Sequence, residues 1–129
     1  MAIGAVCSPL PAQNALPEQP LSPAELINAG RYEEALPLLA SLEEKWAAAV
    51  ERDPQPAYQL DWARVLRALG MVEDRIANFA RAIPRQEQAL DLVEKNQAPV
   101  GLRGDALDAL GLANHHAGDF LTAETWFLR

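Results

Sequence analysis

The sequence predicts an all-α fold, from its composition and from the spacing of its apolar residues. Alanine and leucine together supply 43 of the 129 residues, whereas valine, isoleucine and threonine supply only 12. Alanine and leucine lose little free energy on entering a helix, while β-branched residues favour strands. In residues 35–50 the apolar side chains recur every three or four positions, which is the period of one helix face. The length favours a single domain after a short leader.

Prolines and glycines divide the chain into this leader and six expected helices. The first 23 residues hold five of the ten prolines and neither lysine nor arginine, which predicts a flexible leader over residues 1–21. Ser22 is a suitable N-cap for a short first helix that ends at Gly30. Pro84 is expected to kink or interrupt the fourth helix, because its ring clashes with the carbonyl four residues earlier. The other helices are expected over residues 32–52, 57–69, 72–95 and 102–117, and from residue 120 onward.

Three glycines indicate an internal repeat. Gly30, Gly70 and Gly118 are 40 and 48 residues apart, and each is expected to end one helix and to open the turn into the next. Glycine suits that position because a positive φ costs it nothing. After the last of these glycines come an aromatic residue, Phe120, and a small one, Ala123.

The third unit resembles the tetratricopeptide repeat in its Leu110-Gly111 pair, in Gly118-Asp119-Phe120 and in Ala123 and Phe127. The spacing is similar to that of the long repeats of kinesin light chains and of bacterial repeat proteins of this type. The resemblance covers residues 22–129 and divides them into units 22–55, 56–99 and 100–129, the last truncated. The second unit departs from the family at Arg75, where a small residue is usual. The resemblance implies antiparallel helical hairpins stacked as a short right-handed solenoid.

The charge balance and the apolar runs exclude several classes of partner. The formal net charge of −7 argues against nucleic acid, which is bound by clustered lysine and arginine. No apolar run reaches the roughly 18 residues that a membrane span needs, so membrane insertion is not expected. The short apolar run 2–7 has no basic residue before it, which favours a cytoplasmic protein. The alternative is an exported or cell-envelope protein, because Cys7 follows Gly4-Ala5-Val6, a faint likeness to a lipoprotein cleavage site.

The sequence offers no catalytic or metal-binding constellation. His115 and His116 are adjacent, so on a helix their side chains diverge by about 100° and do not converge on one metal ion. No serine or cysteine lies in a nucleophile motif, and no glycine-rich loop carries the lysine of a phosphate site. We therefore expect no enzyme activity, metal or cofactor for this chain.

The resemblance implies a concave groove built from the first helix of each unit. On units two and three it places these partner-binding residues: Leu60, Arg64, Arg67, Asp105, Asp108, Leu112 and His115. Ala57, Ala68 and His116 fall on the same face. The leucines would supply apolar contact and the charged residues would set orientation and selectivity. The alternative is that these charges only pair with one another across the helices.

Three functions follow as expectations. The first is a scaffold that binds a peptide or protein segment in the groove. The second is the regulatory repeat region of a larger enzyme, for example a caspase-like peptidase, or of a signalling protein. The third is self-association through the C-terminal helix, whose apolar stripe over residues 120–128 needs neighbours to cover it.

Overall fold

The computed structural model describes residues 20–129, and every regular element in that range is an α-helix. The all-α prediction is confirmed for these residues. The predicted leader, residues 1–21, and Cys7 lie almost wholly outside them. In chain order the helices are α2 (Pro23–Asn28), α3 (Tyr32–Arg52), α4 (Pro56–Arg75), α5 (Phe79–Lys95), α6 (Val100–His116) and α7 (Phe120–Leu128).

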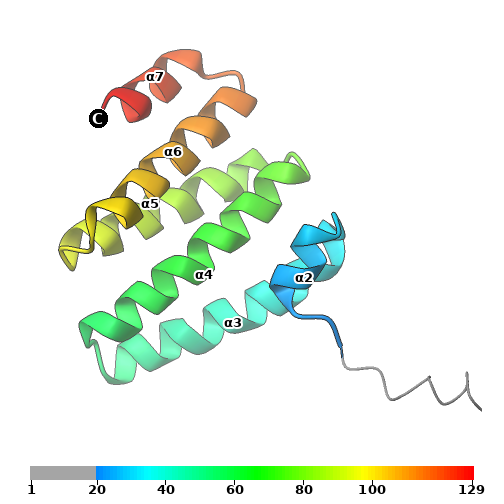
Figure 1. Cartoon of the computed structure of the whole chain (residues 1–129), viewed down its shortest axis with the longest axis vertical. Helices are drawn as coiled ribbons and strands as arrows, with labels where there is room; N and C mark the ends of the chain where they lie inside the picture. The colour runs from blue at the N-terminus through cyan, green and yellow to red at the C-terminus, as the bar shows by residue number, and fades with distance from the viewer. Residues whose placement is uncertain (1–19) are drawn as a thin grey trace, which may run out of the picture.

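The helices lie beside one another in the order of the chain (Figure 1). Consecutive helices pack together, and α4 also contacts α6, so these two share one face of the molecule. The apolar core is accordingly a series of linked clusters. Leu26, Ala35 and Leu69 join α2, α3 and α4. Leu66 and Val93 join α4 to α5, and a third cluster joins α5 to α6.

The helices form three consecutive pairs, α2 with α3, α4 with α5 and α6 with α7. The turns inside these pairs have the same geometry. Gly30, Ala77 and Gly118 have positive φ of 74°, 64° and 88°. In each turn the next residue donates its N–H to the carbonyl five residues before it: Arg31 to Leu26, Asn78 to Glu73 and Asp119 to Asn114, at 2.7–2.8 Å. Such bonds satisfy carbonyls that the end of a helix leaves free. The turn between α5 and α6 has the same form, with Gln97 at a φ of 51° and the Ala98 N–H bonded to the Val93 carbonyl at 3.1 Å, so the geometry recurs at residues 30, 77, 97 and 118.

The predicted boundary at Gly70 is wrong. Helix α4 continues through Gly70 to Arg75, and α5 begins at Phe79 rather than at Val72. Pro84 lies inside α5 without dividing it. With the turn at Ala77, the small residue three positions after the turn aromatic is Ala82, buried like Ala35 and Ala123. Arg75 is thus not an anomaly in the repeat, because it ends α4.

Gly70 and Gly111 instead occupy equivalent places in the middle of α4 and α6, each seven residues before its turn. A Cβ added at Gly70 would lie 2.6 Å from Nε2 of Gln86, and one at Gly111 would lie close against the ring of Phe127. These glycines therefore let a side chain of the partner helix approach the backbone of α4 or α6. None of the helices in residues 20–129 has the length and apolar character of a membrane span.

Candidate functional site

The face that α4 and α6 share contains a cavity of about 190 Å³, which we call the α4–α6 pocket. Each of the two helices lines the cavity with residues spaced mainly by three or four along one of its faces. Helix α5 contributes the buried residue Gln86. The lining residues are Arg67, Met71, Asp74, Arg75, Gln86, Asp105, Asp108, Ala109, Leu112 and His116.

The pocket has charged ends and an apolar middle. Arg67 and Asp105 lie at one end, with a nitrogen–oxygen distance of 3.9 Å. His116 contacts Asp74 through Nδ1 at the other end, 2.9 Å from Oδ2. Along α4 the two ends are seven residues apart, which is about 10 Å at the helical rise. The middle is formed by Met71, Ala109 and Leu112.

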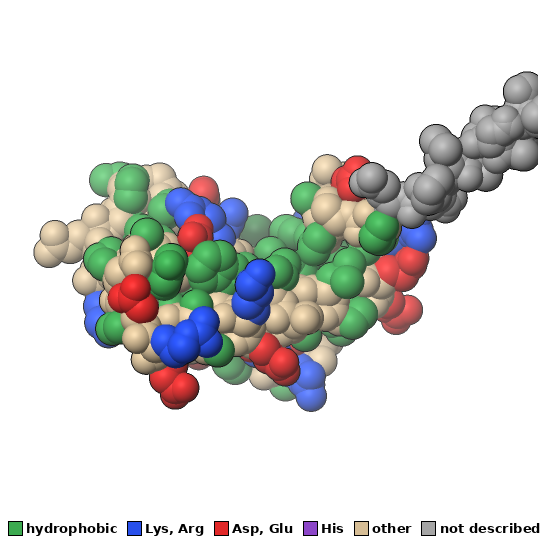
Figure 2. All heavy atoms as spheres, turned by 90° about the horizontal axis from the view of Figure 1, so that it is seen from below, with side chains coloured by type: hydrophobic (Ala, Val, Ile, Leu, Met, Phe, Trp, Pro, Cys, Tyr) green, Lys and Arg blue, Asp and Glu red, His purple; other side chains and the backbone are tan. Residues whose placement is uncertain are grey.

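Two charged residues of the pocket have no ion-pair partner among the described residues. Asp108 and Arg75 make no ion pair within residues 20–129, although Asp105 and Asp74 on the same helices do. Leu112 keeps 47% of its surface exposed beside them. Figure 2 shows hydrophobic side chains among acidic and basic ones on the molecular surface.

The structure brings four of the predicted groove residues together: Arg67, Asp105, Asp108 and Leu112 line the pocket. The other three lie elsewhere. Leu60 is half-buried against the cluster that joins α4 to α5. Arg64 pairs with Asp61 on its own helix at 2.8 Å. His115 turns away, and its ring meets Phe120 edge-on with 4.9 Å between centroids, so His116 is the histidine in the pocket.

The sequence reasoning missed the residues that follow the misplaced turn. The sequence pattern places Met71, Asp74 and Arg75 in a turn and a second helix, whereas they continue the face of α4. Gln86 was missed because nothing in the sequence showed which helix it would face. The Leu69-Gly70 pair, repeated as Leu110-Gly111, was the signal that could have aligned α4 with α6.

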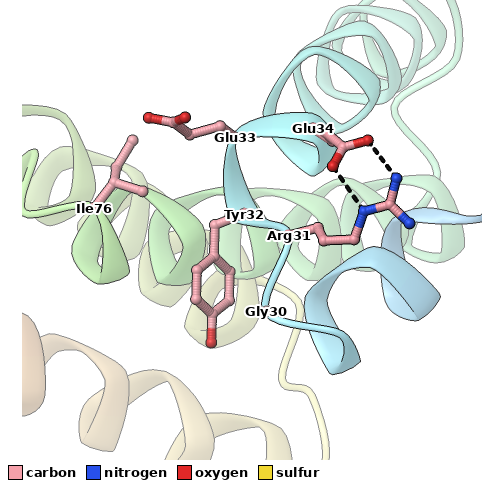
Figure 3. Close-up of a pocket in the computed structure, with 6 residues that line it drawn as sticks. All are labelled: Gly30, Arg31, Tyr32, Glu33, Glu34 and Ile76. Atoms are coloured by element: carbon pink, nitrogen blue, oxygen red, sulfur yellow. Dashed lines mark hydrogen bonds and ion pairs between the residues drawn. The ribbon is translucent and has the colours of Figure 1, made fainter.

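A second hollow, of about 350 Å³, surrounds the turn between α2 and α3 (Figure 3). Arg31 donates two hydrogen bonds to the carboxylate of Glu34, at 2.6 and 2.7 Å. Both side chains are exposed, so the pair contributes little to stability. Arg31 and Glu34 satisfy each other, as Figure 3 shows, and Glu33 is the one other charged residue in the lining, so this hollow offers fewer unpaired charges than the α4–α6 pocket.

The Arg31–Glu34 pair predicts a titration result. The hydrogen bond from Arg31 lowers the pKa of Glu34, and the same bond raises the pKa of Arg31. In the variant Arg31→Gln the pKa of Glu34 is expected to rise, as followed by carboxyl-carbon NMR. Because the folded-state pKa is lowered, the pair stabilises the fold above the ordinary pKa of glutamate and loses this effect as the pH falls. Arg81→Gln is the control, and an unchanged Glu34 midpoint in Arg31→Gln would contradict the assignment.

Helix α7 presents a separate apolar surface. Leu121 and Leu128 are each 81% exposed. The residues at the same distances after the turn at Ala77 are Ala80 and Glu87. Both are also exposed, although α6 packs against α5. These two leucines therefore lie outside the face by which one helical pair packs on the next.

Three findings bear on the function of this chain. The pocket joins apolar and charged groups on two neighbouring helices. Within residues 20–129 no cluster of histidine, cysteine, aspartate and glutamate could hold a metal ion. Comparison with protein-family models, curated proteins and solved structures gives no match to the sequence or the fold.

Proposed function

We propose that this chain is a protein-interaction module that holds a segment of a partner protein in the α4–α6 pocket, with no chemical step. The observation that carries the proposal is Leu112, half-exposed in a cavity whose two ends are charged. Apolar contact in the middle supplies affinity, and the charged ends select and orient the segment. The equivalent buried residues Ala35, Ala82 and Ala123 and the two Leu-Gly pairs support a tetratricopeptide-like repeat as the scaffold.

The size of the pocket favours a side chain of a larger partner over a free small molecule. Small-molecule sites are commonly about 300–1,000 Å³ and enclose most of the ligand. The α4–α6 pocket, at about 190 Å³, is smaller and lies on an open helix face. Its charged ends are separated by about 10 Å along α4, which an extended peptide spans with about three residues.

Selection from a display library of random linear peptides tests this function. We expect enriched peptides to bind the whole chain and to lose roughly tenfold or more in affinity to the variant Leu112→Asp, because a buried charge replaces the apolar contact. Leu121→Asp is the matched control, since Leu121 is exposed on α7 outside the pocket. A selection that yields no peptide dependent on Leu112 would contradict the proposal.

A further inference from the structure

The floor of the α4–α6 pocket contains a buried hydrogen-bond acceptor without a donor. Gln86 lines the pocket and is 1% exposed. Its Nε2 donates to the backbone carbonyl of Arg67 at 3.0 Å. That carbonyl can only accept, so the amide nitrogen must face it and the amide oxygen must point elsewhere. Oε1 has no hydrogen-bond partner among the described residues.

Packing does not require a polar residue at this position. Gln86 lies nine positions after the turn residue Ala77. The residues nine positions after Gly30 and Gly118 are Leu39 and Phe127. Leu39 is buried in the core cluster of α2, α3 and α4, so the fold accepts an apolar side chain there. A buried acceptor without a donor lowers the stability of the fold, because it has lost its hydrogen bonds to water. The glutamine therefore destabilises the fold, and a ligand that donates a hydrogen bond to its amide oxygen would remove this effect.

More acceptors gather at the same end of the pocket. Asp105 and Asp108 extend from α6. The basic residues of the lining are Arg67, opposite Asp105, and Arg75 and His116, which lie next to Asp74 in the chain or in contact with it. Arg67 reaches Asp105 only at 3.9 Å, and Asp108 has no ion pair within residues 20–129. The lining therefore contains three carboxylates, of which Asp108 has no ion pair among the described residues, and the amide oxygen of Gln86, which has no donor.

We propose that this end of the α4–α6 pocket binds a lysine or arginine side chain of the partner segment. The cationic group lies against Asp105 and Asp108 and donates a hydrogen bond to Oε1 of Gln86. The aliphatic stem of the same side chain lies on Met71, Ala109 or Leu112, as long basic side chains do on apolar surface. The net charge of −7 also attracts a basic segment over longer distances. This inference rests on the proposed function and specifies its ligand.

Short peptides that differ in one charge test the inference. Acetyl-Ala-Arg-Leu-amide is titrated into the labelled full chain and followed by the amide NMR signals of Ala109 and Leu112. The same peptide with citrulline has nearly the same shape without the charge, and a lysine version separates ammonium from guanidinium. We expect the arginine or the lysine peptide to bind at least about tenfold more tightly than the citrulline peptide.

Two variants assign the contacts. Asp108→Asn is expected to weaken the basic peptide about tenfold, and its exposed position makes it safe for folding. Gln86→Leu, which restores the residue type of Leu39, is expected to weaken the same peptide while keeping the native amide spectrum. Asp61→Asn is the matched control, because Asp61 is an exposed carboxylate on α4 outside the pocket.

The outcomes separate this inference from the proposed function. Equal binding of the arginine and citrulline peptides would overturn the basic ligand, as would binding that Asp108→Asn leaves unchanged. The absence of any shift with all three peptides would also overturn it. In each case display-selected peptides that depend on Leu112 would leave the interaction module standing, with a segment of different chemistry.

Discussion

Replacing Arg85 with methionine is expected to lower the free energy of unfolding by about 3 kcal/mol. Arg85 on α5 pairs with Glu73 on α4, with Nε 3.1 Å from Oε1. The glutamate side chain is 2% exposed, whereas Arg85 keeps 28% of its surface. Removing the arginine leaves a carboxylate buried without a counter-charge, and that desolvation is the source of the effect. Urea unfolding followed by circular dichroism measures it.

Two further variants identify the cause. Arg81→Met removes an exposed arginine from the same helix and is expected to change stability by about 0.5 kcal/mol or less. The double variant Glu73→Leu with Arg85→Leu copies Leu26 and Leu38 of the first helical pair, and it is expected to recover most of the loss. A double variant as unstable as Arg85→Met would show that packing around Arg85, and not the buried charge, holds α4 to α5.

Replacing Leu66 with alanine is expected to cost about 3 kcal/mol. Leu66 is fully buried where α4 packs on α5, beside Ala89 and Val93. Its neighbours include alanines too short to fill the space that the lost methyl groups leave, so a cavity would remain. The same unfolding experiment measures the change. Leu121→Ala is the control: Leu121 is 81% exposed, and its variant is expected to match the parent within about 0.5 kcal/mol. Equal losses in both would contradict the assigned core.

The helix content of this chain could be predicted because its apolar spacing and its proline breaks are local signals. The turn between α4 and α5 could not. Ala77 takes a φ of 64°, a conformation that is uncommon for a residue other than glycine. Gly70, the residue that looked suited to the turn, serves close packing against Gln86 instead. The same residue type answers two different needs, and only the three-dimensional contacts distinguish them.

Part of the lining of the α4–α6 pocket could also be predicted, because helical spacing is a local signal. Arg67, Asp105, Asp108 and Leu112 lie on helix faces that the repeat spacing defines, and they do line the pocket. Asp74 could not be placed on this face, because the sequence predicts a turn at Gly70 and so puts Asp74 in the next helix. The choice between His115 and His116 depends on one step of about 100° around α6, which helical spacing alone did not resolve.

The order of the helices in space has a consequence for folding kinetics. Because each helix packs mainly on its neighbours in the chain, contacting residues are close in sequence, and closing the loops between them costs little entropy. Chains of this kind fold within microseconds to milliseconds, faster than those built from distant strand pairings. Helices α2–α5 can thus assemble while α6 and α7 are still being synthesised, and those two helices then dock on a folded template.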